Sequence, residues 1–334
     1  MKRLLILFFM LIVALQNADA QLLPLFGGTR TGTTGFQFLK NSVDARGSSM
    51  GGAFIAEVND VSALYWNPAG ITKVDTQHIH LMASQTSFFA GMNQQFVGAV
   101  IKKSAETFFG VSYMGFYSPE MLYTTEFQPY GTGQTFRAYD MAVGVTLARI
   151  LTDNFSFGIT AKYLRESYAE VHTQNGVVDF GFQYEVGKAN TRFAAGVSNF
   201  GFTAEPKGTV IATTLNGINT LSGFEKMAVP AMFRLGVAWD AVKKKDNRLT
   251  FCGQLNHPTD NNETFSLGGE YSWKENLFAR TGYELGQDEN GLPSFGFGLK
   301  FKRRFGIIQM DYGFSNKHTL GNIHRLTFSL SLFN

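Results

Sequence analysis

The sequence has little charge, a single cysteine and no long apolar segment beyond its first residues. Of its 334 residues, 16% are Asp, Glu, Lys or Arg, and the formal net charge of +3 is too small to predict binding to nucleic acid. Cys252 stands alone, which excludes an intrachain disulfide framework and a metal cluster built from thiolates. After residue 20, no apolar run approaches the roughly 18 residues that a membrane-spanning helix needs.

The first 20 residues have the pattern of a secretory signal peptide. Met1-Lys2-Arg3 is basic, residues 4–15 are apolar, and Ala18-Asp19-Ala20 supplies the small residues of a cleavage site. The alternative is a membrane anchor, but this apolar run is too short for one. We therefore predict that residues 1–20 direct export and are removed.

The sequence is rich in aromatic residues and glycine, with 33 Phe, 12 Tyr and 36 Gly. They follow a period of two: Phe295, Phe297 and Phe301 alternate with glycine and lysine. Such a period indicates a β-strand with two different faces. In a transmembrane barrel the apolar face meets lipid and the other face lines the lumen, whereas in a soluble sandwich the apolar faces of two sheets pack together.

Fourteen segments carry this pattern, and closed bacterial barrels have an even number of strands. We predict an all-β fold, a transmembrane antiparallel β-barrel of about 14 strands over residues 76–334. The expected strands are 76–88, 93–103, 106–117, 136–150, 154–168, 176–187, 191–201, 229–242, 247–257, 263–275, 277–286, 293–303, 305–316 and 320–333.

The connections between these segments favour an outer-membrane barrel over a sandwich. Every second connection is tight, as at 152–153 or 304, and most of those between are longer, such as 118–135, 169–175 and 202–228. Short periplasmic turns that alternate with long external loops are typical of barrels in the cell outer membrane. The last strand, RLTFSLSLFN, alternates in the same way and resembles the end of such barrels, although Phe333 falls on the opposite face.

Charged side chains of both signs point into the lumen if the strand assignment holds. Mixed charges favour a closed, packed interior over an ion-selective pore, so we expect these groups to pair with one another or with the N-terminal segment and to leave little steady conductance. The residues are Asp140, Lys162, Asp179, Glu185, Arg234, Asp240, Glu270, Arg280, Glu284, Lys300, Lys302, Asp311 and Arg325.

Residues 21–75 precede the first strand and are too apolar for a free periplasmic tail. Asn67 suits the N-cap of a short helix, Pro68 suits its first position, and Gly70 suits its end. We predict that this segment forms a hatch in the periplasmic mouth of the barrel, with Tyr65 and Trp66 packed inside. A separate periplasmic subdomain is the alternative, for which the segment is short. The hatch motif is Tyr65, Trp66, Asn67, Pro68, Ala69 and Gly70.

The segment DARGSSMGGAFIAEVNDVSALYWNPAGI resembles the N-terminal signature of the PorV/PorQ proteins of Bacteroidetes, a branch of the FadL-like outer-membrane barrels. Weaker matches are GITAKYLRESY at 158–168, FAAGVSNFG at 193–201 and MDYGF at 310–314. The resemblance implies a plugged barrel in type IX protein secretion. Its partners would then be the translocon and attachment components, secreted proteins with C-terminal sorting domains, and outer-membrane lipid.

Two functions follow from these features. In the first, the long external loops bind secreted proteins without any enzymatic step. In the second, the barrel is a FadL-like channel for uptake of hydrophobic small molecules, with Met121, Leu122, Tyr123 and Phe127 around an apolar pocket. The candidate loop residues for a partner or ligand are Met121, Leu122, Tyr123, Phe127, Tyr130, Phe202, Ile211, Leu215, Ile218, Leu221 and Phe224.

The sequence gives little support to an enzyme. The acidic stretch GQDENG at 286–291 lacks the spacing of a calcium-binding loop. His78 and His80 share one face of the first strand but have no obvious third metal ligand nearby. We therefore predict no catalytic residue, no metal site and no cofactor.

Overall fold

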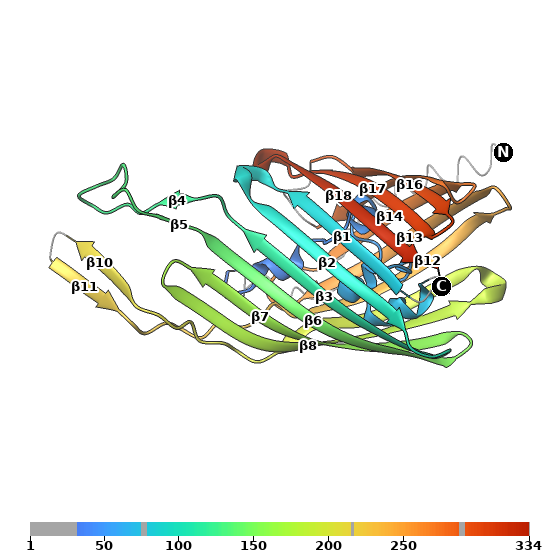
Figure 1. Cartoon of the computed structure of the whole chain (residues 1–334), viewed down its shortest axis with the longest axis horizontal. Helices are drawn as coiled ribbons and strands as arrows, with labels where there is room; N and C mark the ends of the chain where they lie inside the picture. The colour runs from blue at the N-terminus through green and yellow to red at the C-terminus, as the bar shows by residue number, and fades with distance from the viewer. Residues whose placement is uncertain (1–31, 75–78, 215–216, 287–290, 334) are drawn as a thin grey trace, which may run out of the picture.

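The computed structural model describes residues 32–74, 79–214, 217–286 and 291–333 and forms a closed barrel (Figure 1). Fourteen antiparallel strands make the wall, as the sequence predicts. They are β1 (Ile79–Ser87), β2 (Asn93–Lys102), β3 (Thr107–Tyr117), β6 (Ala138–Thr152), β7 (Phe155–Tyr168), β8 (Val171–Val186), β9 (Thr191–Gly201), β12 (Met232–Lys243), β13 (Asn247–Pro258), β14 (Thr264–Trp273), β15 (Leu277–Leu285), β16 (Ser294–Arg303), β17 (Gly306–Asn316) and β18 (Asn322–Leu332).

The first and last wall strands close the barrel. β1 pairs with β18 along its whole length, from Ile79 opposite Leu332 to Ser87 opposite His324. Closure leaves no open sheet edge, so backbone groups all around the wall have partners. Among the described residues, no helix is long and apolar enough to cross a membrane.

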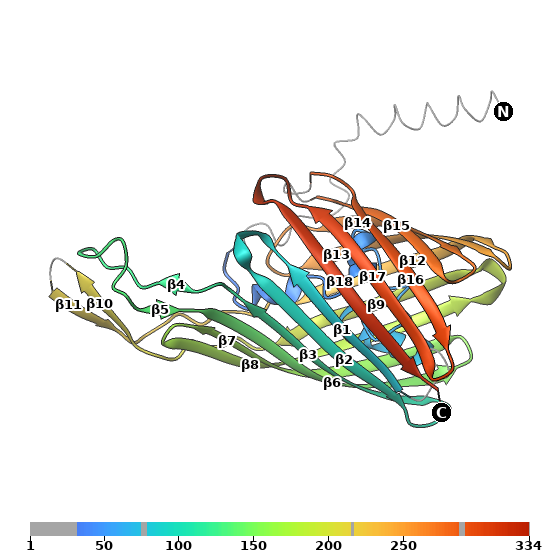
Figure 2. The same cartoon turned by 45° about the horizontal axis from the view of Figure 1, so that its top comes forward.

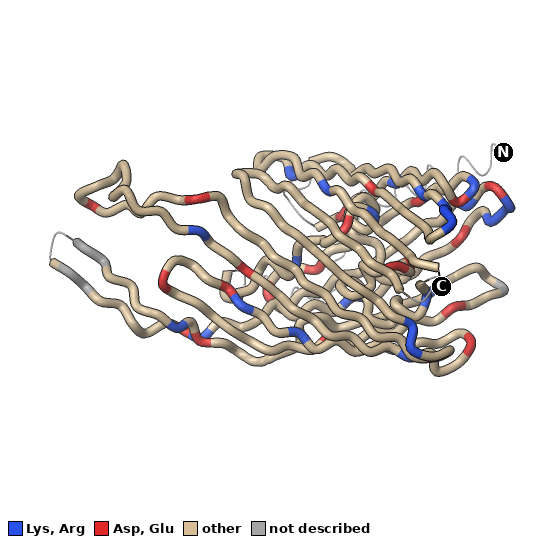
Figure 3. Tube along the Cα trace, viewed as in Figure 1, with Lys and Arg blue, Asp and Glu red and all other residues tan. Residues whose placement is uncertain are grey.

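Side chains alternate across the wall as the period of two predicts. In β16, Phe295, Phe297 and Phe301 are exposed on the outer face, whereas Gly296 and Gly298 are buried on the inner face. Most of the tube along the wall strands is uncharged, and Lys, Arg, Asp and Glu gather mainly toward the strand ends (Figure 3). An apolar outer surface around a closed barrel is suited to contact with lipid.

The two ends of the barrel differ. At one end, which we call the short-turn end, the connections are tight, and 304–305 between β16 and β17 is an example. At the other, the long-loop end, two hairpins extend well beyond the wall (Figures 1 and 2): β4 (Met121–Leu122) with β5 (Thr135–Phe136), and β10 (Val210–Thr214) with β11 (Gly217–Leu221). The alternation of connection lengths is therefore largely as predicted.

One expected loop is wrong. Residues 169–175 do not form a loop, because β8 begins at Val171 and only residues 169–170 separate it from β7. Ala169 takes a positive φ of 52°, which permits this tight reversal. As a result β7 and β8 continue as a hairpin beyond their neighbours (Figure 1).

Residues 32–74, which we call the plug, fold inside the barrel. They contain the short helices η2 (Gln37–Lys40), α2 (Ala45–Ser49), α3 (Ala63–Trp66) and η3 (Pro68–Lys73). α2 packs on β15 to β18, and η3 packs on β3, β6, β7 and β8, so the plug contacts opposite parts of the wall. Most of the buried apolar side chains belong to the plug and to the wall residues around it.

The Asn67-Pro68 turn fits closely against the wall. The Asn67 side chain accepts a hydrogen bond from Ala69 N at 3.1 Å, as an N-cap does, and donates to Phe182 O of β8 at 3.0 Å. A Cβ on Gly181 would overlap Asn67, and one on Gly158 would overlap the Pro68 backbone. Gly70 does not end the helix, which continues to Lys73. A Cβ at position 70 would overlap Val58, so glycine is needed there for close packing.

Candidate functional site

Ion pairs join the plug to the wall across the lumen. Glu57 of the plug accepts hydrogen bonds from Arg192 at 2.5 Å and from Arg248 at 2.8 Å. Arg46 of the plug binds Glu270 of β14 at 2.8 Å, and Glu270 in turn binds Arg280 at 2.6 Å. These side chains are mostly buried, so screening by solvent is weak and the pairs hold the plug in one position.

Wall side chains also satisfy the backbone of the plug. Gln254 of β13 accepts hydrogen bonds from Phe54 N at 3.0 Å and Ile55 N at 2.8 Å, and Gln183 of β8 donates to Ala56 O at 3.0 Å. Glu166 of β7 accepts from Phe36 N at 2.6 Å. Pairing of inward charges with one another and with the N-terminal segment, which the sequence predicts, is thus found at several positions.

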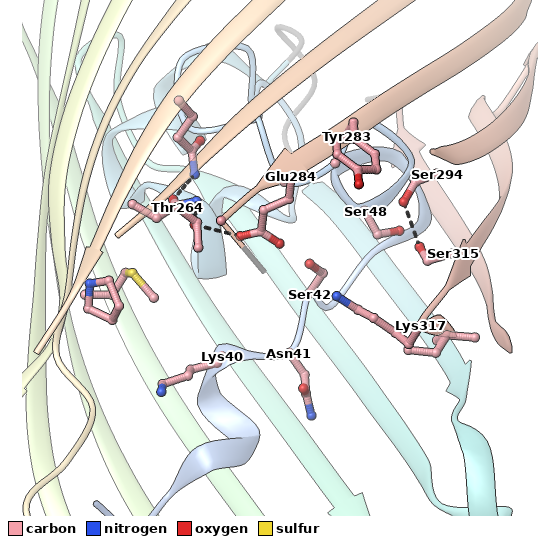
Figure 4. A pocket seen from close by; sticks show the side chains of 18 of the residues that line it. Lys40, Asn41, Ser42, Ser48, Thr264, Tyr283, Glu284, Ser294, Ser315 and Lys317 are labelled. Carbon is pink, nitrogen blue, oxygen red and sulfur yellow. Dashed lines mark hydrogen bonds between the residues drawn. The ribbon is translucent and has the colours of Figure 1, made fainter. Parts of the chain in front are cut away.

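A cavity of about 370 Å³ lies between the plug and strands β12 to β18. It extends to connections of the long-loop end, where Asn261 and Lys317 line it. Figure 4 shows Glu284 pointing into this space from β15, with Ser42 of the plug and Lys317 nearby. Most of the lining side chains are polar; the aromatic ones include Tyr65, Trp66 and Phe88.

Two arginines of this cavity differ from those that hold the plug. Arg234 donates to Ser198 Oγ at 2.9 Å, and Arg325 donates to Ser315 Oγ at 3.3 Å. Within the described part of the chain, neither has a carboxylate within ion-pair distance, although both are nearly fully buried. The Arg234 guanidinium instead lies 5.5 Å from the centre of the Tyr65 ring and 5.6 Å from that of Trp66.

Asp44 of the plug is a buried carboxylate that contacts Trp66. It accepts hydrogen bonds from Trp66 Nε1 and from Gly47 N, both at 2.7 Å. Burial and then the charge of Asp60 raise the pKa of Asp44 to about 6. The Asp44 charge also acts on Arg325, but at a range beyond an ion pair. Asp44 therefore orients Trp66 on the cavity wall.

A second cavity of about 240 Å³ lies toward the short-turn end. Lys73 and Glu185 line it together with Glu57, Arg192 and Asp240 of the ion-pair network. The plug thus has a cavity toward each end of the barrel, with buried ion pairs along the second one.

The predicted loop residues lie away from the cavity. Met121, Leu122, Tyr123, Phe127 and Tyr130 belong to the β4–β5 excursion, and none of them lines the cavity. Tyr130 is 95% exposed and Phe202 is 86% exposed. Ile211, Leu221 and Phe224 belong to the β10–β11 excursion; Leu215 and the side chain of Ile218 lie outside the described residues.

The predicted hatch motif is central to the site, but sequence reasoning missed several of its partners. Tyr65 and Trp66 line the cavity, and their rings contact each other edge to face at 5.0 Å. Asp44, Arg46 and Glu57 were not singled out, although charges in so apolar a segment are themselves a signal of buried pairing. His78 lies outside the described residues, and His80 bonds to Ser331; no group of three metal ligands occurs in the described ranges.

Comparison with known proteins relates this architecture to transport barrels. A scan of protein-family models finds no match, and a search of the curated proteins finds none either. Among solved structures, the Ralstonia pickettii toluene transporter TbuX has a TM-score of 0.59 and 12% identity, with 88% of this chain and 99% of that chain covered. The Pseudomonas putida toluene transporter TodX has a TM-score of 0.56 and 13% identity, with coverage of 87% and 96%.

A third similar structure is a Pseudomonas aeruginosa FadL homologue, with a TM-score of 0.52, 13% identity, and coverage of 92% and 98%. At such identities the likeness shows a shared fold, and the solute does not follow from it. This chain has the fold of FadL-type outer-membrane barrels, which confirms the fold implied by the resemblance in the sequence. The PorV/PorQ type and the role in type IX secretion stay predictions.

Proposed function

We propose that this protein is a FadL-type channel in the outer membrane, through which small molecules pass from the long-loop end to the periplasm. The observation that carries the proposal is the cavity of about 370 Å³ above the plug and the smaller one below it. A solute enters the first cavity, and a shift of the plug connects it to the second. The apolar outer face and the fold similarity support the same function.

The solute is small and organic, by analogy with the similar structures. TbuX and TodX are described as toluene transporters, which favours hydrophobic solutes. The lining of the cavity is mainly polar, however, and the apolar loop residues Met121, Leu122, Tyr123 and Phe127 do not contribute to it. A polar group on the solute is therefore better matched to this protein than a plain hydrocarbon.

A reversible cross-link between the plug and the wall tests the channel. A Cβ on Gly236 of β12 would lie 3.8 Å from Ala56 Cβ, which suits a disulfide. The same Cβ would contact the Ile55 side chain, so Ala56→Cys and Gly236→Cys are combined with Ile55→Ala and with Cys252→Ser. Uptake of radiolabelled toluene and benzoate is measured in a Gram-negative host that lacks FadL-type channels of its own.

We expect uptake of at least one of these solutes to stop when the disulfide forms and to resume after reduction. The matched controls are the two single-cysteine variants in the same background, for which oxidation leaves uptake unchanged. Uptake that continues at the same rate through the cross-linked protein would overturn the proposal, since the plug would then not be in the path.

We also propose, as a second candidate, that the protein takes part in type IX secretion of the PorV/PorQ kind by binding C-terminal sorting domains. The specific observation in its favour is the pair of hairpins beyond the barrel wall. They carry exposed apolar side chains such as Tyr130 and, at the base of the second, Phe202. Exposed apolar groups on extended hairpins suit docking of a folded β-domain.

Shortening these hairpins tests the second candidate separately. Residues 121–136 and 205–226 are each replaced by a short turn, and the protein is purified gently from its native outer membrane. Secreted proteins with sorting domains, or translocon and attachment subunits, should accompany the full chain and be lost from the shortened one. If only lipid or a small molecule accompanies the full chain, secretion is not its function.

A further inference from the structure

The arginines of the interior fall into two groups by their partners. Arg46, Arg192, Arg248 and Arg280 each form ion pairs with at least two carboxylates. Arg234 and Arg325 form none with the described residues, yet they are only 4% and 5% exposed. A buried charge without a counter-ion is costly, because the protein does not replace the water it has lost.

Arg325 has unused hydrogen-bonding capacity at the cavity. Its Nε is buried without a partner, and its only hydrogen bond to the described chain is the long one to Ser315 Oγ. Its guanidinium lies 5.8 Å from the centre of the Phe88 ring, which offsets part of the cost of burial. A guanidinium with free donors at a cavity is suited to accept a carboxylate or phosphate oxygen.

Tyr65 adds a third donor from the plug. Its hydroxyl is buried, forms no hydrogen bond of good geometry with the described residues, and lies close enough to the Arg234 guanidinium to interact with it directly; the charges of both Arg234 and Arg325 act on it. Burial raises the pKa of this hydroxyl, so it stays protonated and can donate. Three buried donor groups, one from the plug and two from opposite arcs of the wall, thus meet around one space.

We propose that Arg234, Arg325 and Tyr65 bind the oxyanion, a carboxylate or a phosphate, of a small organic solute in this cavity. The proposal rests on the proposed channel function and names the class of solute. Trp66 and Phe88 provide flat apolar surfaces for the organic part of the solute. Binding at this place lets the plug sense the solute directly, because Tyr65 and Trp66 belong to α3.

The other charged groups of the cavity are compatible with an anion. Lys40 is paired with Asp260 at 2.7 Å, and Lys317 lies at the rim. Glu284 is the one acidic side chain among the lining residues, and it accepts a hydrogen bond from Thr264 at 2.8 Å. Cationic side chains therefore outnumber acidic ones around the space.

Binding by the purified full chain in detergent tests the proposal. Calorimetric titrations use benzoate, phenyl phosphate and toluene, which share a ring and differ in the group attached to it. We expect at least one of the two anions to bind more tightly than toluene. The ratio of the dissociation constants of benzoate and phenyl phosphate tells whether the site prefers carboxylate or phosphate. Arg325→Gln and Tyr65→Phe should each weaken binding of the preferred anion by about tenfold or more, as loss of a charge-assisted or buried hydrogen bond implies.

Arg137→Gln is the matched control, because Arg137 pairs with Glu120 on the exposed surface far from the cavity lining. Tyr65→Phe removes one oxygen that makes no hydrogen bond of good geometry with the described residues, so it decides the question even if Arg325→Gln does not fold. Toluene binding that equals or exceeds that of both anions, or anion binding unchanged by Tyr65→Phe, would overturn the proposal. The cross-linked plug should still bind the anion while uptake stops, so failure of transport and failure of the anion site are distinguishable.

Discussion

The lumen contains two kinds of charged surface. Toward the short-turn end, Glu57 and Asp240 are each shared by Arg192 and Arg248, and every one of these groups has an opposite charge within 3.1 Å. Toward the long-loop end, Arg234 and Arg325 face a cavity, and their hydrogen bonds of good geometry within the described chain go to the hydroxyls of Ser198 and Ser315. Both sets are buried in the same barrel, so burial alone does not explain how they differ.

The difference separates structural from binding roles. Paired charges fix the plug against the wall, and removing one partner leaves the other buried and uncompensated. Unpaired arginines contribute little to that fixation and remain available to a solute. Variants of the first set should therefore change stability, and variants of the second set should change binding.

The largest effect is expected from Glu270→Gln. Glu270 accepts hydrogen bonds from both Arg46 and Arg280, so the amide leaves two buried guanidiniums without their shared carboxylate. We expect the free energy of unfolding in urea to fall by about 3–5 kcal/mol. Glu106→Gln is the control, since its pair with Arg149 is exposed, and its effect should stay below about 1 kcal/mol. Equal losses of unfolding free energy in Glu270→Gln and Glu106→Gln would contradict the distinction between buried and exposed ion pairs.

A smaller and local effect is expected from Asn67→Ala. The change removes the N-cap of η3 and the hydrogen bonds to Ile55 O and Phe182 O. Local opening of η3 should become easier by about 1–3 kcal/mol, measured by hydrogen exchange of the amides of residues 69–73. Asn261→Ala, in a connection of the long-loop end, should leave that exchange unchanged. Undiminished protection in Asn67→Ala would show that packing alone holds the turn.

Asp260 provides a pH-dependent contact between the plug and a loop. Burial alone would raise its pKa, but hydrogen bonds from Gln37, Lys40 and Thr34 together hold it below its ordinary value. A lowered pKa in the folded state means that the contact stabilises the plug above the ordinary carboxyl pKa and is lost as the pH falls below it. Protection of amides 37–40 against hydrogen exchange should decrease from pH 7 to pH 3.

The variant Asp260→Asn isolates that contribution. Its amide cannot ionise, so protection of the same amides should be low at both pH values and nearly independent of pH. A pH dependence equal to that of the unchanged protein would assign the effect to other groups.

The smallest effect on stability is expected from Tyr65→Phe. Among the described residues the hydroxyl makes no hydrogen bond of good geometry and only approaches the Arg234 guanidinium, so its removal should change the free energy of unfolding by less than about 0.5 kcal/mol. Trp66→Phe is the matched comparison, because it removes the donor to buried Asp44 and should cost about 1–3 kcal/mol. A large loss in Tyr65→Phe would mean that its hydroxyl has a structural role.

The sequence predicts the wall far better than the interior. A period of two assigns each strand residue to a face, and this is why Arg234 and Arg325 could be placed in the lumen. Their lack of a counter-ion could not be predicted, because it depends on how the plug backbone lies against strands far away in sequence. The ion pair of Arg46 with Glu270 could not be predicted for the same reason. The start of β8 at Val171 was missed because residues 169–175 carry no clear apolar alternation.

The seam between β1 and β18 has a consequence for biogenesis. The plug precedes β1 in the chain, and the wall closes only when the final strand pairs with the first. We expect the buried charges of Arg46 and Glu57 to meet their wall partners only after β9, β13 and β14, which carry those partners, have assembled. A chain that stops before β18 would leave them in an open, half-built sheet. We therefore expect the plug to become fully ordered only when the barrel is complete, so that a chain truncated before β18 is less stable than the full one.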